Sequence, residues 1–256
     1  MWDLVPRREA MNVIDTKWIY KNKSDENDIV VDQSMYRSMI GSFLYLTASR
    51  PDINFAVGVC VRYQAEPKIS HLTQAKRIMK YINSTSDYGI MYLHSENSIL
   101  ICYCDADWAG SFDDNKSTYG GCFFLGNNLI SWFSKKQNSV SLSTAKAEYI
   151  AARSSFSQLV WMKQMQKEYN VEQDVLTLYC DYLSAINISK NPIQHSRTKH
   201  IDIRHHFIRD LVEDKVVTLE HVDTEEQLVD IFTKALNAKQ FEKLRGKLGI
   251  FLHEEA

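Results

Sequence analysis

The chain has 256 residues, of which 45% are hydrophobic, and it contains only nine glycines and four prolines. This composition excludes a disordered chain and provides enough apolar surface for one large or two small packed domains. The net charge of −2, from 30 basic and 32 acidic residues, excludes the overall basic character that many nucleic-acid-binding proteins show.

The first residues lack the features of a targeting signal. The opening MWDLVPRREAMN has no basic start followed by an apolar block, and no apolar run approaches the roughly 18 residues that cross a bilayer. We therefore expect an intracellular chain, in the cytoplasm or nucleus, with no signal peptide and no membrane partner. Within residues 1–32, the run TKWIYKNKSDENDIVV predicts two short strands joined by a turn, a piece too small to fold alone.

Residues 33–95 carry a helical pattern. A first group of apolar residues recurs with a period near 3.6, and the pattern breaks at Pro51. Further helices are predicted over residues 53–64 and 71–83. The three helices contain no catalytic cluster, and they need a partner surface to form a core.

From residue 98 the pattern changes to strand-like runs. ILICYCDADW, STYGGCFFLG and NLISWFSKK are separated by turn-rich stretches, and they predict three consecutive antiparallel strands. Most of the five cysteines lie inside such apolar runs, and their number is odd, so we expect reduced core thiols. A long amphipathic helix follows from Ser143 to about Tyr169, capped by Ser143 or Thr144.

The rest of the chain alternates between strands and helices. VLTLYCD predicts a strand, followed by a short helix over residues 183–189 and a second helix in IDIRHHFIRDLVED. VVTLEHV predicts the fifth strand, and a last helix is predicted from Glu225 to about Leu236. This order indicates an α/β fold with a mixed five-stranded sheet and flanking helices, in which right-handed crossovers place strands four and five parallel to strand one.

Two of the predicted core strands end in an aspartate. ICYCD ends at Asp105 and LYCD ends at Asp181, and the carboxyl ends of neighbouring parallel strands meet at one edge of such a sheet. A lone Asp after a strand is usually a loop residue or helix cap, but two on adjacent strands predict a site. Glu148 lies among small and apolar residues of the long helix, where a carboxylate is costly unless it is paired or bound to metal. Asp230 lies inside the predicted last helix, and a solvated helix face is its alternative interpretation.

Four converging carboxylates with no matching Lys or Arg in their motifs would repel one another. Divalent cations relieve this repulsion, and Mg²⁺, or Mn²⁺ with the same oxygen ligands, suits carboxylates that also share the ion with phosphate. Two such ions about 4 Å apart can activate water and stabilise a departing 3′ oxygen, which predicts phosphodiester hydrolysis without a protein nucleophile. The sequence contains no nucleophile elbow, CxxC pair or Gly-rich phosphate loop that would favour other chemistry.

Basic residues suggest where a phosphate backbone could bind. Lys199 and Arg204 lie in a basic stretch that also contains Arg197 and His200, and Lys135 lies at the end of the third strand beside Lys136. A solvated helix face is the alternative for the basic stretch. A zinc site among the histidines of this region is disfavoured, because the adjacent His205 and His206 cannot share one helix face with the others.

Several strings of the sequence resemble the carboxyl-terminal part of copia-type retrotransposon Pol polyproteins. They are MYRSMIGSFLYLTASRPDINFAV, YCDADWAG, SLSTAKAEYIA, LYCDYLSAI, KHIDIRHHFIRD and VDTEEQLVDIFTKAL, and the resemblance covers nearly the whole chain. It implies a ribonuclease H-like fold, with Asp105, Glu148, Asp181 and Asp230 as the acidic positions. It also implies that Ser143 and Thr144 contact the RNA strand, for which helix capping is the alternative.

The resemblance also implies a division of the chain. Residues 1–32 resemble the start of a reverse transcriptase, 33–95 a helical thumb- or connection-like segment, 96–240 the ribonuclease H-like domain, and 241–256 a tail. The polymerase palm with its Tyr-x-Asp-Asp turn is missing between the first two parts, through a deletion or a gene model that skipped sequence, so no polymerase activity is expected. The family often has Asn after the third carboxylate, where this chain has Tyr182, and no histidine precedes the last helix in the loop VDTEEQ.

Three functional hypotheses follow. The first is an endonuclease that uses two Mg²⁺ or Mn²⁺ ions to hydrolyse the RNA strand of RNA–DNA hybrids, within a retrotransposon polyprotein whose other parts are further partners. The second is an inactive remnant, or a co-opted effector-like protein that binds nucleic acid or protein. The third is a transposase or exonuclease on the same fold, which would share the metal site and differ only in partner contacts.

Overall fold

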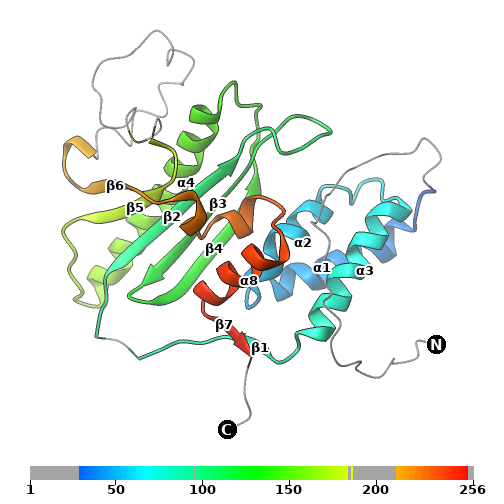
Figure 1. Cartoon of the computed structure of the whole chain (residues 1–256), viewed down its shortest axis with the longest axis horizontal. Coiled ribbons are helices and arrows are strands. Elements are labelled where there is room, and N and C mark those ends of the chain that lie inside the picture. Colours follow the sequence, from blue (N-terminus) through cyan, green and yellow to red (C-terminus); the bar gives the residue numbers. More distant parts are fainter. Residues whose placement is uncertain (1–28, 95, 184–185, 187–211, 253–256) are drawn as a thin grey trace.

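The computed structural model of the protein describes residues 29–94, 96–183, 186 and 212–252, and in it a five-stranded sheet lies beside a smaller group of helices (Figure 1). The predicted hairpin in residues 1–28 and the basic stretch with Lys199 and Arg204 lie outside these residues. So do most of the two helices predicted between residues 183 and 214. Among the described residues, no helix has both the length and the apolar character needed to cross a membrane.

The three predicted helices at the start of the described chain are confirmed. They are α1 (Gln33–Leu46), α2 (Asn54–Val61) and α3 (Ile69–Ser84), with a 3-10 turn at Pro51–Ile53 before α2. Asp32 caps the start of α1, and its side chain accepts a hydrogen bond from the Met35 amide at 2.9 Å. Their apolar faces form a common core, which includes Tyr36, Ile40, Phe43, Val57, Ala75 and Ile78.

The sheet has the strand order β4-β3-β2-β5-β6. Its strands are β2 (Leu100–Asp107), β3 (Thr118–Leu125), β4 (Asn128–Lys136), β5 (Leu176–Cys180) and β6 (Val217–His221). β2, β3 and β4 pair antiparallel, whereas β5 is parallel to β2 and β6 is parallel to β5. The predicted α/β fold with a mixed five-stranded sheet is therefore confirmed.

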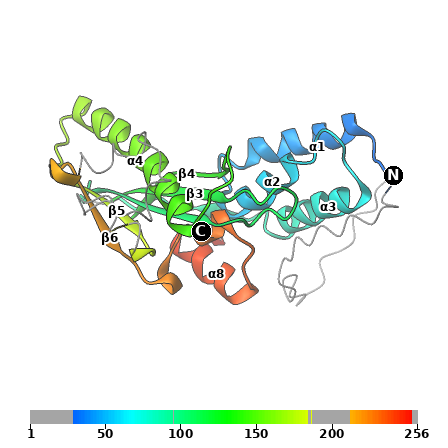
Figure 2. The ribbon, with the colours of Figure 1, turned by 90° about the horizontal axis from the view of Figure 1, so that it is seen from above.

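Helices cover both faces of the sheet. α4 (Thr144–Glu168) packs on one face over a core that includes Cys104, Phe123 and Phe156, while α8 (Ala238–Lys247) lies on the other face (Figure 2). The short helix α7 (Asp230–Thr233) and α8 share a second core with β3 and β4. All five cysteines are free and buried, as predicted.

The end of the chain differs from the prediction. The helix predicted over residues 225–236 is wrong in extent, because a 3-10 turn at Thr224–Glu226 is followed by an extended Gln227 and by the four-residue α7. The Gln227 side chain is fully buried and donates a hydrogen bond to the Cys104 carbonyl at 2.9 Å, which holds this break against the sheet.

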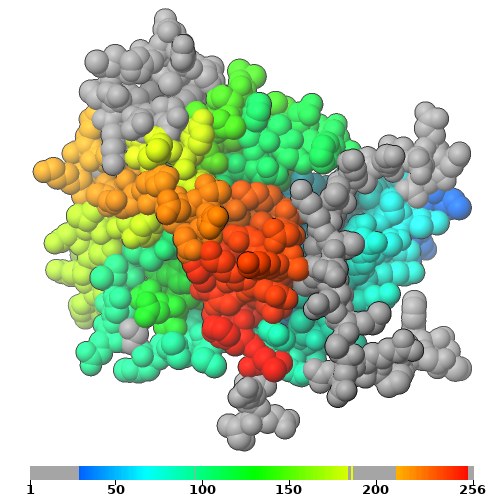
Figure 3. Space-filling view, in the orientation of Figure 1, coloured from blue at the N-terminus to red at the C-terminus, as the bar shows by residue number. Residues whose placement is uncertain are grey.

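Two short strands and α8 were not predicted. β1 (Tyr88–Ile90) pairs antiparallel with β7 (Ile250–Leu252), and α8 runs across the boundary predicted at residue 240. Residues 241–252 thus pack on the rest of the chain, and Figure 3 shows this segment, in red, between the sheet and the helical segment. The division into four domains stays a prediction.

A buried polar network joins the helical segment to α8. Arg50 forms an ion pair with Asp52 at 2.7 Å, and Asp52 also accepts a hydrogen bond from the Tyr81 hydroxyl at 2.7 Å. Arg245 of α8 donates to the Tyr81 oxygen at 3.1 Å and stacks over the ring of Tyr88. Because the Asp52 side chain is fully buried, loss of its charge leaves Arg50 without its balancing anion.

We therefore expect Asp52→Asn to lower the free energy of unfolding by about 3 kcal/mol or more. The measurement is urea-induced unfolding followed by circular dichroism. Asp87→Asn is the matched control, since Asp87 is exposed and its replacement should change stability by less than about 0.5 kcal/mol. Equal stabilities of the two variants would show that the buried ion pair contributes little to the stability of the fold.

Candidate metal centre

Two of the predicted carboxylates lie side by side at one end of the sheet. β2 and β5 are in parallel register, with Tyr103 opposite Tyr179, and continuing this register places Asp105 beside Asp181. Asp105 is only 2% exposed, and its carboxylate accepts a hydrogen bond from the Thr233 hydroxyl of α7. The predicted meeting of the two strand ends is thus present.

The first turns of α4 bring a third carboxylate to this edge. Ser143 caps the helix by accepting a hydrogen bond from the Lys146 amide at 3.2 Å, and Glu148 follows one turn later. The side chain of Glu148 is buried, and its Oε1 accepts a hydrogen bond from the Ala106 amide at 3.2 Å. This bond ties α4 to the residue that follows Asp105 on β2.

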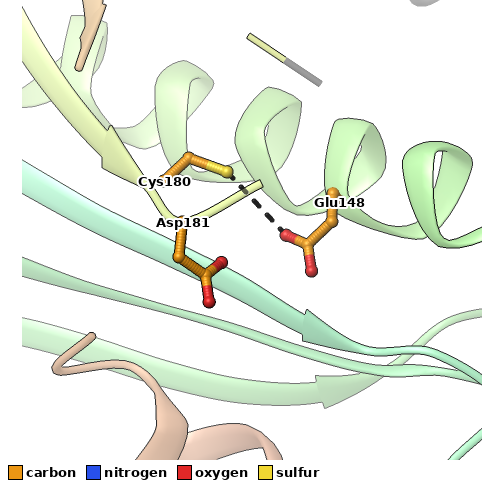
Figure 4. A group of neighbouring side chains, drawn as sticks. All are labelled: Glu148, Cys180 and Asp181. Carbon is orange, nitrogen blue, oxygen red and sulfur yellow. Dashed lines mark hydrogen bonds between the residues drawn. The ribbon is translucent and has the colours of Figure 1, made fainter. Parts of the chain in front are cut away.

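Glu148 also lies close to the end of β5. One ligand atom each from Glu148, Cys180 and Asp181 lie within 4.8 Å of one another, and the Cys180 thiol is 4.0 Å from Glu148 Oε2 (Figure 4). The thiol is a soft ligand that Mg²⁺ does not favour, whereas the two carboxylates provide hard oxygens. A magnesium site here would use the two carboxylates and leave the thiol as a buried neighbour.

The fourth carboxylate arrives from α7, which lies directly on the sheet. Gly120 is the β3 partner of Asp105, and a Cβ atom at Gly120 would be 3.0 Å from side-chain atoms of Val229 and Phe232. The absence of a side chain at Gly120 therefore permits the close approach that places Asp230, the first residue of α7, at the site. Asp230 is 4% exposed.

Burial and mutual repulsion disfavour the ionised forms of these carboxylates. Burial raises the pKa of Asp230 to about 7, and the charge of Asp105 adds to this effect. The pKa of Glu148 is raised well above its usual value by burial and by Asp105, and burial also raises that of Asp105. A cation that enters the centre would relieve both effects.

One cation of the chain already lies at the centre, and it corrects the expectation that the acidic motifs contain no matching Lys or Arg. Lys234 lies four residues after Asp230, and its Nζ is 2.8 Å from Asp230 Oδ1. The charge of Lys234 and its hydrogen bond both lower the pKa of Asp230, but burial and the charge of Asp105 outweigh them. One ammonium group does not balance four carboxylates, so the donor set fits divalent cations with hard oxygen ligands.

The predicted substrate-binding residues have varied surroundings. Ser143 is the helix cap, and Thr144 donates a hydrogen bond to the Tyr182 hydroxyl at 2.9 Å, so the capping alternative for Ser143 is present in the structure. Lys135 is exposed at the end of β4, with its Nζ 5.7 Å from the centre of the Phe133 ring. These contacts do not test substrate binding, which stays a prediction.

Two charged residues near the carboxylates were not predicted from the sequence. Asp107 follows Asp105 by two residues on the same strand, and burial and the charge of Asp105 raise its pKa to about 6. Arg62, at the end of α2, donates a hydrogen bond to Thr118 at 2.8 Å and lowers the pKa of Asp107 by its charge. The alternation of the strand could have indicated Asp107, whereas the approach of α2 has no local signal.

No family model matches the chain. Known proteins with similar sequences were nevertheless found. The chain is 37% identical over 220 residues to the retrovirus-related Pol polyprotein from transposon RE2 of Arabidopsis thaliana, covering 86% of this chain and 15% of that protein. It is 39% identical over 216 residues to the Pol polyprotein from transposon TNT 1-94 of Nicotiana tabacum, covering 84% and 16%. The secreted RxLR effector protein 161 of Plasmopara viticola is 38% identical over 128 residues, which cover 50% of this chain and 90% of the effector.

Among solved structures, the N-terminal RNase H domain of rv2228c from Mycobacterium tuberculosis is 8% identical, with a TM-score of 0.40, and covers 58% of this chain and 97% of that chain. RNase H1 from Halobacterium salinarum is 11% identical with a TM-score of 0.35, covering 49% and 86%. The chain is much more similar in sequence to the Pol polyproteins than to these two solved structures. It spans about 15% of the length of the Pol polyproteins that it matches. On these sequence matches, the chain belongs to the family of Pol polyproteins from copia-type retrotransposons.

Proposed function

We propose that the chain is a ribonuclease H segment that hydrolyses the RNA strand of RNA–DNA hybrids with two divalent metal ions, Mg²⁺ or Mn²⁺. The observation that carries this proposal is the convergence of Asp105, Glu148, Asp181 and Asp230 at one edge of the sheet, from four different elements. The relationship to retrotransposon Pol polyproteins supports the same substrate class. When bound, the metal ions would supply activation of water and stabilisation of the leaving 3′ oxygen.

The chain's own residues would orient the carboxylates for this work. The Thr233 hydroxyl fixes the carboxylate of Asp105, and the Ala106 amide fixes that of Glu148. Both donors belong to regular or tightly packed segments, so they hold the oxygens in place before a metal ion arrives. Asp181 is less buried than the other three and would face the substrate side of the centre.

Recognition of the hybrid would rest on backbone shape rather than on base sequence. Ser143, Thr144 and Lys135 are the proposed contacts within the described chain, and Lys199 and Arg204 are proposed contacts outside it. The metal ions would add positive charge that the chain as a whole lacks, given its net charge of −2. Polymerase activity is not expected, because the sequence contains no Tyr-x-Asp-Asp turn.

A second candidate is a non-catalytic protein that keeps the fold and binds nucleic acid or another protein. The similarity to RxLR effector protein 161 favours this candidate, since that effector matches this chain over 90% of its own length. The two candidates differ in one property that can be measured, namely hydrolysis of a hybrid that depends on the four carboxylates.

Asp105→Asn should reduce cleavage of a labelled RNA–DNA hybrid by more than about a hundredfold, because it removes a charge that would contact the metal ions. The assay uses purified protein with Mg²⁺ or Mn²⁺, and circular dichroism verifies that the variant is folded. Asp174→Asn is the matched control and should retain the parent rate. Asp174 is exposed and lies just before β5, at the end of the sheet opposite the carboxylates.

Cleavage by Asp105→Asn at the parent rate would contradict the catalytic assignment. Absence of cleavage by folded parent protein with either metal would favour the non-catalytic candidate.

The raised pKa values predict how pH affects stability without metal. Because the folded-state pKa of Asp230 is about 7 and its unfolded value is near 4, the folded state binds more protons between these values. Metal-free protein should therefore lose stability as pH rises through this window, and Glu148 acts in the same direction.

The thermal unfolding midpoint, measured with EDTA from pH 5 to pH 8, should fall by several degrees as these groups lose protons. Mg²⁺ should raise the midpoint more at pH 8 than at pH 6, because the metal binds the ionised carboxylates. Asp230→Asn should flatten the metal-free pH dependence. A midpoint that rises steadily with pH in the absence of metal would contradict the burial of these acids.

A further inference from the structure

Lys234 is a charged residue in contact with one of the four carboxylates, and the proposed chemistry does not use it. It ends α7 with an extended backbone, and its ammonium group lies 2.8 Å from Asp230 Oδ1. Burial by itself lowers the pKa of Lys234, but the charges of Asp105 and Asp230 raise it overall, so the side chain is a cation. It is therefore held at the site by carboxylates that are also the proposed metal ligands.

The ion pair is a short contact to one carboxylate oxygen. Asp230 Oδ1 is buried, and the Lys234 ammonium lies 2.8 Å from it. The lysine thus compensates the charge of this carboxylate. A divalent cation at the same oxygen would supply a larger compensating charge.

The side chain of Lys234 also has room to leave. It lines a largely apolar pocket between the helical segment and the α7–α8 region, together with Ile231, Tyr81 and Phe241. The aliphatic part of a lysine packs well on such a surface, while 35% of the side chain is exposed to solvent. The ammonium can therefore move toward solvent while its stem keeps its packing.

We propose that Lys234 is a resident counter-cation that competes with divalent metal for Asp230 and thereby weakens metal binding in the absence of substrate. An ammonium group and a divalent ion that share one carboxylate oxygen repel each other strongly at a partly buried site. Metal binding at Asp230 therefore displaces the ammonium. This inference rests on the proposed metal-dependent function, and it assigns to Lys234 control of metal affinity.

The test compares Lys234→Met, which keeps an unbranched apolar stem and removes the charge, with Lys234→Arg, which keeps the charge. Binding of Mn²⁺ is measured by electron paramagnetic resonance, and stabilisation by Ca²⁺ is measured from the thermal unfolding midpoint, both without nucleic acid. We expect Lys234→Met to bind metal at least about tenfold more tightly than the parent, because repulsion from the ammonium is lost. Lys234→Arg should stay within about threefold of the parent, because the charge remains.

The controls separate this inference from the proposed function. Asp105→Asn should weaken metal binding in both the parent and the Lys234→Met background, which locates the measured ion at the centre. If Lys234→Met does not fold, Lys234→Gln is measured in its place. Metal affinity that is unchanged or weaker in the uncharged variant would overturn the role of Lys234 alone. Absence of metal binding by the parent and by all variants would overturn the proposed metal-dependent function as well.

Discussion

Repulsion among the carboxylates at one edge of the sheet governs the architecture of the candidate metal centre. Asp105, Glu148 and Asp230 are nearly fully buried, so water screens their charges poorly. The fold holds them together by rigid means, namely the parallel pairing of β2 and β5, the capped start of α4 and the close contact of α7 with Gly120. The Lys234 ammonium compensates part of this repulsion at Asp230, and divalent cations would compensate the rest.

The helical segment, formed by α1, α2 and α3, contributes to the site by packing against α7 and α8. The buried network of Arg50, Asp52, Tyr81 and Arg245 connects α3 to α8, and the pocket beside it is lined by both Tyr81 and Lys234. Packing of the helical segment therefore supports the face of the sheet from which Asp230 arrives. Arg62 reaches the same edge from α2, so the two parts of the chain meet next to the carboxylates.

The sequence predicts the parts of the fold and site that depend on local pattern. Apolar runs that end in Asp105 and Asp181 indicate both the strands and their shared edge, and Glu148 stands out because its neighbours are small or apolar. The extent of α7 could not be predicted, because the break at Gln227 depends on a hydrogen bond to a carbonyl 123 positions away. The strands β1 and β7 are three residues long, too short for an alternating pattern, and become strands by pairing with each other.

The energetics of the centre bear on the choice between a nuclease and a non-catalytic protein. A binding protein that uses only the surface of this fold gains nothing from buried carboxylates, since uncharged residues of similar volume at these positions would make it more stable. Yet the chain places all four acids together and adds Thr233 and Ala106 as hydrogen-bond donors that orient two of them. The orientation of the acidic oxygens has a use where a metal ion must be held in defined geometry. The cost of this arrangement in stability thus favours the proposed metal-dependent hydrolysis over the proposed binding role.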